Sequence, residues 1–425
     1  MIKIIATSDW HLGNLFHGND RLPEHKHFLN WLLEQVKTYE PDALLVAGDV
    51  FDNGNPSAAS QSAYYEFLAD ATQACPQMQV IITAGNHDSA SRLEAPRPML
   101  TRHKVEIRGT VHREWRQATE NENGYWQVYY DDLLIPVSNS QGEQVVVLAV
   151  PYLRSDMVQN PNYSQGVNNF LRDLTQRARE LYPGKTLVMM AHMYAKGADI
   201  AKSDYSEKIV IGGQEEVNME GWTDHPDYMT CGHIHKRQHI WNTDWARYTG
   251  SVLPMSFAEK DYTHGVDLVT FEADRHPKVE QLVYEPQHKL VVLPDDDSEL
   301  SPAKLKTLIK KALPDRLHEK PDEDSCYVVL KVKMDKANND DIRELEDLMN
   351  TKNAVLCKIQ KIMPQTDIST IVGSRQLKSL DDILNRDPME TLKEAYLIEH
   401  GIDMSEGQTA LLTDLLNGIK NETND

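Results

Sequence analysis

The stretch IKIIATSDWHLG, residues 2–13, places a short apolar run directly before two residues that can bind metals, Asp9 and His11. The same arrangement returns in ALLVAGD, residues 43–49, and in VIITAGNHD, residues 80–88. Apolar residues recur at helical spacing before and after the second of these runs. The resulting order of strand, helix, strand, helix and strand predicts an α/β fold with a parallel, layered sheet.

Later apolar runs also end in candidate ligands. His192 follows one run, and His233 and His235 follow the next. Because the carboxyl ends of parallel strands open at one edge of a sheet, we expect these side chains to converge. Asp9 and His11 are two residues apart, so an extended backbone would turn both side chains the same way, as it would for the last two histidines. The later strands are predicted at residues 145–150, 186–190, 228–231 and 266–271.

The candidate ligands are carboxylates, a carboxamide and imidazoles, which favour manganese, iron or zinc. Two divalent ions about 3.5–4 Å apart can share one carboxylate, clamp the oxygens of a phosphate and activate a water molecule. Asp49 is the natural bridging ligand, because it is the acid that directly follows Gly48. His87 is better suited to donate a proton to the leaving oxygen or to stabilise the transition state as a cation, since its neighbour Asn86 would be a ligand. Asp88 would then orient the His87 imidazole.

Composition narrows the functional classes. The chain of 425 residues corresponds to about two to four domains, and its formal net charge of −21 repels polyphosphates. Nucleic acid could bind only through a local basic face, bound metal ions or a basic partner. Four widely spaced cysteines argue against a disulfide framework or a cysteine zinc site. No apolar run approaches the roughly 20 residues of a membrane span, and no secretory signal is visible, so we expect a cytoplasmic protein without a membrane partner.

The chain changes character after an acidic stretch at residues 294–297. A helix capped by Ser301 follows, and then two strands at residues 327–334 and 355–362 flank a second helix, which predicts a small α+β unit. The predicted domains are residues 1–285, 286–364 and 365–425.

Alternation along these two strands places lysines on one face of the small sheet. Lys331 and Lys333 share a face of the first strand, and Lys358 lies opposite the apolar face of the second. If the strands pair, the three lysines line a polar surface that DNA phosphates could contact. A solvated sheet face without a ligand is the simpler alternative.

Two short amphipathic helices are predicted after residue 364. The first begins at Asp387 and Pro388, and the second begins at a capping box of Ser405 and Gln408. Helices of this length are marginal alone, so their apolar stripes need an outside surface. The stripes consist of Met389, Leu392, Ala395, Tyr396, Leu411, Leu412, Leu415, Leu416 and Ile419.

The metal-binding motifs resemble those of calcineurin-like metallophosphoesterases, in the order of that family. SDWHLG at residues 8–13, GDVFD at 48–52, GNHDS at 85–89 and YTGSVLP at 248–254 resemble, more narrowly, the SbcD nuclease subunits of bacterial SbcCD DNA-repair complexes. This resemblance implies an α/β, four-layer calcineurin-like sandwich with a small α+β capping domain and a C-terminal helical tail. It also implies a double-strand exonuclease and single-strand or hairpin endonuclease in DNA end processing, repair and recombination.

The resemblance further implies two divalent ions, Mn²⁺, with His87 as the catalytic histidine. Archaeal and eukaryotic members of the family carry a second histidine three residues after the bridging aspartate, where this chain has Asp52. We expect Asp52 to cap the next turn. One ion would be held by Asp9, His11, Asp49 and His235, and the other by Asp49, Asn86, His192 and His233.

DNA and an SbcC-like ATPase of the SMC family are the partners that the resemblance implies. The expected assembly is a heterotetramer with two copies of each subunit, associated with the nucleoid, and a homodimer of this chain is a further expectation. The tail would grip the coiled-coil base of the ATPase, although it could instead fold back on the small domain. The residues expected to make this contact are Leu392, Tyr396, Leu412 and Leu416.

Two other functions stay open. A metallophosphoesterase could use the same ions on a small phosphodiester or a phosphoprotein, but such an enzyme would not need the small unit and the tail. A non-catalytic scaffold is also conceivable, but the complete set of ligands and His87 argue against it.

Overall fold

The computed structural model describes residues 1–117, 124–158, 160–199, 216–219, 221–272, 277–296, 298, 300–322, 324–333 and 339–362, and, in the tail, residues 389, 393, 396, 404–405, 408–409 and 412–413. The chain divides into two compact units. The first unit comprises Met1–Val292, Asp315–Val329 and Asn353–Lys358, and the second comprises Leu293–Pro314, Leu330–Lys352 and Ile359–Asp425.

The first unit contains two six-stranded sheets. The first sheet has the order β16-β15-β1-β4-β5-β6, and its last four strands run parallel. The three strands predicted to be parallel, β1, β4 and β5, are parallel neighbours, and β15 and β16 add an antiparallel hairpin beside β1, which makes the whole sheet mixed. Its strands are β1 Ile2–Thr7, β4 Ala43–Ala47, β5 Gln79–Thr83, β6 Val105–Arg108, β15 Gly265–Phe271 and β16 Pro277–Val283.

The second sheet has the order β13-β14-β12-β11-β10-β9. Strands β10, β11, β12 and β14 are parallel neighbours, with β9 and β13 antiparallel at the two edges. Its strands are β9 Leu134–Ser138, β10 Gln144–Ala149, β11 Thr186–His192, β12 Tyr228–Gly232, β13 Gln238–His239 and β14 Ala246–Tyr248.

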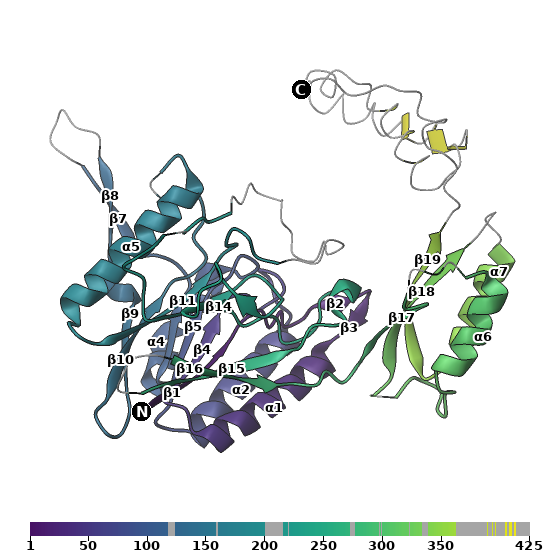
Figure 1. Ribbon diagram of the computed structural model, residues 1–425, viewed down its shortest axis with the longest axis horizontal. Coiled ribbons are helices and arrows are strands. Elements are labelled where there is room, and N and C mark those ends of the chain that lie inside the picture. Colours follow the sequence, from purple (N-terminus) through teal and green to yellow (C-terminus); the bar gives the residue numbers. More distant parts are fainter. Residues whose placement is uncertain are drawn as a thin grey trace. The chain divides into compact units, whose positions relative to one another are not determined.

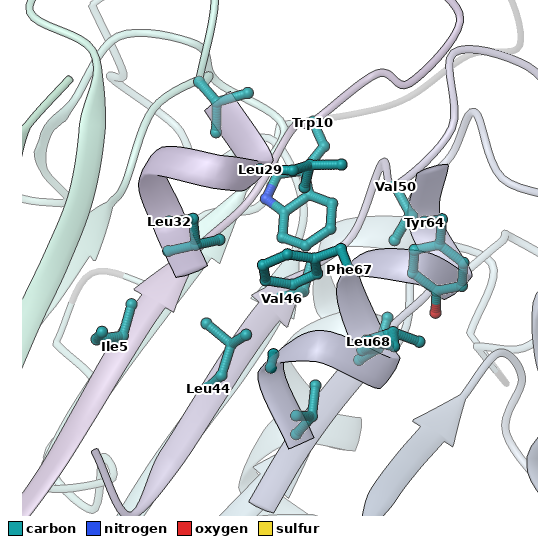
Figure 2. Close-up of a cluster of buried hydrophobic side chains, with 14 of the residues drawn as sticks. Ile5, Trp10, Leu29, Leu32, Leu44, Val46, Val50, Tyr64, Phe67 and Leu68 are labelled. Atoms are coloured by element: carbon teal, nitrogen blue, oxygen red, sulfur yellow. The ribbon is translucent and has the colours of Figure 1, made fainter. Parts of the chain in front are cut away.

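Helices cover the outer faces of the two sheets, which confirms the four-layer sandwich. Helices α1, Leu22–Tyr39, and α2, Ala58–Ala74, pack on the first sheet, and α5, Tyr163–Leu181, packs on the second (Figure 1). Alternate strand residues enter different cores: on β1, Ile5 packs under the helices and Ile4 packs between the sheets. Figure 2 shows the helix-side core.

Shorter elements connect these layers. They are β2 Leu15–Phe16, β3 Asn19–Asp20, α3 Ala90–Glu94, α4 Arg97–Leu100, η1 Thr101–His103, β7 Arg113–Arg116, β8 Tyr125–Val128, η2 Tyr130–Leu133 and η3 Phe257–Glu259.

No helix among the described residues is both long and apolar enough to cross a bilayer.

A three-stranded sheet follows in the order β17-β18-β19. The two predicted strands are neighbours in it, and the predicted helix begins at Pro302 with Ser301 at the N-cap. The elements are β17 Leu290–Leu293, α6 Pro302–Ala312, β18 Cys326–Lys333, α7 Asn339–Met349 and β19 Ala354–Ile362.

The described positions of the tail confirm its predicted capping box. The backbone N–H of Ser405 donates to the side chain of Gln408 at 2.9 Å, and the backbone N–H of Gln408 donates to the Ser405 hydroxyl at 3.3 Å. The Gln408 amide also donates to the hydroxyl of Tyr396 at 3.0 Å. Leu392 and Leu416, predicted to contact a partner, lie outside the described residues.

Candidate metal centre

The candidate ligands follow five parallel strands of the two sheets. Asp9, Asp49 and Asn86 come two or three residues after β1, β4 and β5, which are neighbours in the first sheet. His192 ends β11, and His233 follows β12, its neighbour in the second sheet. The expected convergence of these side chains at the carboxyl ends of the strands is therefore confirmed.

The backbone at these turns is left-handed, not extended as expected. The φ angles are 51° for Asp9, 47° for His11, 49° for Asp49 and 98° for His233. Left-handed non-glycine residues cost about 1–3 kcal/mol each and cluster at functional sites. Backbone hydrogen bonds hold the first turn in place, because Asp9 N–H donates to Gly48 O at 3.1 Å and His11 N–H to Asp49 O at 3.0 Å. The ligands converge because of these turns and not through strand alternation.

Two glycines make the close packing of the turns possible. Gly48 has a φ of 84°, and a Cβ at this position would lie 2.2 Å from Nδ1 of His192. A Cβ on Gly85 would lie 2.1 Å from Oδ1 of Asp49. Any other residue at either position would displace a candidate ligand.

One group of ligands forms around His11. One donor atom from each of Asp9, His11 and His235 lies within 4.8 Å of the others, and all three residues are buried. Oδ2 of Asp49 lies 3.7 Å from Nε2 of His11. The structure thus brings together the four residues expected to hold one ion.

A second group forms around Asn86. Its Oδ1 lies 2.9 Å from Nε2 of His192 and 3.0 Å from Nδ1 of His233. Oδ2 of Asp49 lies 3.4 Å from Nε2 of His192. Asp49 therefore stands between both groups, as a bridging carboxylate would.

The donor atoms of these groups fit a cation. Both ring nitrogens of His11 are buried without a hydrogen-bond partner among the described residues. Nδ1 of His192 donates to Ala47 O at 3.0 Å, which leaves Nε2 facing the oxygen atoms of Asn86 and Asp49. Burial lowers the pKa of His192, but the charge of Asp49 outweighs burial and raises this pKa to about 9. The carboxylate of Asp49 therefore favours a positive charge at this place, which a bound cation would supply instead of the proton on His192.

His87 is held at the rim of this centre. Its backbone N–H donates to Oδ1 of Asp49 at 2.9 Å. Its ring Nδ1 donates to Asp52 O at 2.8 Å, which leaves Nε2 for a substrate. The His87 ring meets the His11 ring edge-on, with centroids 4.8 Å apart.

Asp88 does not orient His87, contrary to our expectation. Its carboxylate accepts backbone N–H groups of Gly85 at 2.9 Å, Phe51 at 2.9 Å and Val50 at 3.1 Å. Burial and the charge of Asp49 raise the pKa of Asp88 to about 6, although the three N–H groups oppose this shift. Asp88 thus joins the turn after β4 to the turn after β5.

Asp52 does not cap the next turn, which corrects a second expectation. Its Oδ1 accepts a hydrogen bond from the Asn14 amide at 2.9 Å and lies 3.5 Å from Nδ1 of His11. The following turn is closed by Asn53, whose side chain accepts the N–H of Asn55 at 3.0 Å. The carboxylate of Asp52 therefore faces a candidate ligand.

Sequence reasoning missed Glu259. Its Oε1 pairs with Nδ1 of His235 at 3.0 Å, and the residue is fully buried. The one local signal is a serine three positions earlier, Ser256, which gives the spacing of a capping box. That pattern points to a helix start and not to a histidine partner.

The predicted DNA and partner contacts belong to other parts of the chain. Lys331 and Lys333 are half-buried on β18, and Lys358 is exposed on β19. Tyr396 and Leu412, described in the tail, are half-buried. None of these residues is among the ligands of the metal centre.

Comparisons with known proteins agree with this geometry. The family model for calcineurin-like phosphoesterases matches residues 2–237. The SbcD subunit of the SbcCD nuclease from Rhodobacter capsulatus is 33% identical over 331 residues, which cover 74% of this chain and 77% of that protein. The SbcD subunit from Escherichia coli strain K12 is 30% identical over 308 residues, covering 69% and 71% of the two chains. The one from Bacillus subtilis is 29% identical over 274 residues, covering 63% and 66%.

Proposed function

This chain belongs to the calcineurin-like phosphoesterases and, within them, to the SbcD nuclease subunits, and we propose that it cleaves phosphodiester bonds of DNA with two divalent metal ions. The observation that carries the proposal is the position of Asp49 between the two groups of candidate ligands. Two ions sharing one carboxylate suit in-line displacement at a phosphate.

We assign the ligands of each ion from the two groups of side chains, one around His11 and one around Asn86. One ion would be held by Asp9, His11, Asp49 and His235, and the other by Asp49, Asn86, His192 and His233. Mn²⁺ is the proposed metal, because its preferences match oxygen and imidazole donors without thiolates. When bound, the ions would neutralise charge on the phosphate and lower the pKa of a coordinated water.

The side chains around the ligands have separate tasks. As an imidazolium, His87 can keep its Nδ1 proton on Asp52 O and donate the Nε2 proton to the leaving oxygen. Asp88 fixes the turn that carries His87 by accepting three backbone N–H groups. Asp52 faces Nδ1 of His11 and can orient that ring toward the ion.

Partners follow from the same family membership. The relatives are named as subunits of SbcCD. We propose that this chain acts with an SbcC-like ATPase of the SMC family, two copies of each, in DNA repair and recombination in the cytoplasm. The tail, with Leu392, Tyr396, Leu412 and Leu416, would bind the ATPase, and Lys331, Lys333 and Lys358 would contact DNA.

A nuclease assay tests the proposed function. The purified chain should cleave blunt and hairpin-ended DNA with Mn²⁺, and excess EDTA should stop the reaction. The assay is run with and without the ATPase and ATP, beside bis-p-nitrophenyl phosphate as a small diester. Hydrolysis of the small diester, with no cleavage of either DNA under all these conditions, would instead favour a small-substrate phosphoesterase.

A further inference from the structure

A buried ion pair lies at the start of α1, outside the ligand set. The guanidinium of Arg21 donates from Nε and Nη2 to the two carboxylate oxygens of Glu24, both at 2.9 Å. Its Nη1 donates to Pro254 O at 2.5 Å. Arg21 is 0% exposed and Glu24 is 1% exposed. A pair this deep is stable only when its geometry is good and its other hydrogen-bonding groups are satisfied.

Strand β18 reaches this pair through Tyr327, which lies in the first unit. The Tyr327 hydroxyl donates to Oε1 of Glu24 at 3.0 Å. The ring of Phe16 packs against Tyr327 with centroids 5.1 Å apart, and the Arg21 guanidinium lies 5.0 Å from the centroid of the same Phe16 ring. The ion pair thus joins β18 to the segment that contains Pro254.

The segment after Pro254 leads to a ligand of the metal centre. Met255 N–H donates to Oε2 of Glu259 at 2.8 Å, and Oε1 of Glu259 pairs with Nδ1 of His235 at 3.0 Å. On the other side of Pro254, Ser251 N–H donates to His235 O at 2.9 Å. Residues 251–259 therefore hold both the backbone and the ring of His235.

We propose that Glu259 is the positioning residue of His235 and that Arg21, Glu24 and Tyr327 hold Glu259 in place. A carboxylate on Nδ1 leaves Nε2 as the ligating nitrogen and makes that nitrogen more basic. The ion pair fixes Pro254 O, next to the Met255 N–H that Glu259 accepts. The inference rests on the proposed metal centre and adds that one of its two sites responds to β18.

The proposal implies that the binding of one ion, and not of the other, depends on Glu259. Weakening the Glu259 contact affects the ion bound by Asp9, His11 and His235. The ion on the other side of Asp49 depends on His192, whose Nδ1 is fixed by Ala47 O and not by this network. A general loss of packing would affect both ions, whereas a positioning role affects one.

Calorimetric titration of the metal-free full chain with MnCl₂ tests this. In Glu259→Gln we expect one ion to bind about 10–100-fold more weakly, with the other unchanged. Tyr327→Phe should weaken the same ion by about two- to tenfold, the equivalent of one hydrogen bond. Controls are Glu106→Gln, which removes the negative charge that pairs with Arg108, and Tyr130→Phe, which loses a hydroxyl that donates to Asp173.

The outcomes separate this inference from the proposed function. Electron paramagnetic resonance distinguishes a coupled Mn²⁺ pair from a single ion, and Glu259→Gln should lose the coupled signal at limiting metal. Wild-type affinity for both ions in Glu259→Gln, or equal weakening of both, would overturn the inference. Failure of the unmodified chain to bind two ions would instead overturn the proposed metal centre. If Glu259→Gln does not fold, Tyr327→Phe decides the matter in the same way.

Discussion

At the scale of single residues, Asp49 is the side chain on which both proposed metal sites depend. It is buried, left-handed and close to ligands from both sheets. Asp49→Ala should abolish binding of both ions, because each loses the carboxylate that they share. Metal analysis of the purified variant checks this, with the exposed acid Asp70 changed to Ala as the control. Two ions per chain in Asp49→Ala would contradict the assignment.

His87 is proposed to contribute to the rate of cleavage and not to metal binding. Its ring is fixed by Asp52 O and lies in T-shaped contact with the ring of His11. His87→Ala should keep both ions and lose about 10²–10⁴-fold in rate, the usual contribution of a proton donor. The two measurements are metal content and single-turnover cleavage of DNA. Loss of metal together with rate would show that His87 holds a ligand in place instead.

At the scale of elements, the strands were predictable and their endings were not. The buried strand β4 is a continuous apolar run, so its bounds could be read from the sequence, whereas the conformation of the turn that follows it could not. The left-handed turns at Asp9 and His11 were not visible, because non-glycine residues rarely adopt that conformation. Glu259 and the true roles of Asp52 and Asp88 depend on contacts between distant segments. The grouping of the candidate ligands could be predicted from the sequence, whereas the contacts of Asp52, Asp88 and Glu259 could not.

Strands β18 and β19 carry a prediction about DNA. They are neighbours in one sheet, and they carry three lysines in a chain whose formal net charge is −21. Changing Lys331, Lys333 and Lys358 together to Gln should weaken DNA affinity and reduce the salt slope by up to about three, at about 0.9 per phosphate contact. Fluorescence anisotropy from low to moderate salt measures both. The control changes three α6 lysines, Lys304, Lys310 and Lys311, to Gln, and an equal slope in both triple variants would contradict the prediction.

The tail carries a prediction about the partner. Its capping box of Ser405 and Gln408 is observed, and the apolar residues of the helix predicted to follow need a surface. Leu412→Asp with Leu416→Asp should break the complex with the ATPase, because two charges would enter an apolar contact. Size-exclusion chromatography of the co-expressed pair measures this, with Thr413→Asp at an exposed position as the control.

Deleting residues 365–425 should remove the complex but leave Mn²⁺-dependent cleavage of single-stranded DNA. A complex that survives both changes would place the docking surface elsewhere.

At the scale of the whole molecule, the net negative charge and the buried histidines have opposite effects on stability at low pH. The chain carries 65 acidic and 44 basic residues, so acid would at first be expected to relieve repulsion and stabilise it. Buried neutral histidines oppose this. His264 is 5% exposed, and its Nδ1 donates to Ser251 O at 2.9 Å. Burial lowers the pKa of His264 from 6.5 to about 4, and the hydrogen bond to Ser251 only partly offsets it.

The last prediction follows from this histidine. As the pH falls below 6.5, the unfolded chain takes up a proton at His264, while the folded chain does not until about pH 4. The stability that the neutral ring contributes is therefore complete above pH 6.5 and declines by about 1.4 kcal/mol per pH unit below it. His264→Gln keeps a donor for Ser251 O and cannot titrate. Between pH 7 and pH 5, the free energy of unfolding of the metal-free wild type should fall by about 2 kcal/mol more than that of His264→Gln. Urea unfolding followed by circular dichroism measures the difference, with the exposed His103 changed to Gln as the control. Parallel pH profiles for wild type and His264→Gln would show that burial of this ring does not govern the acid sensitivity of the fold.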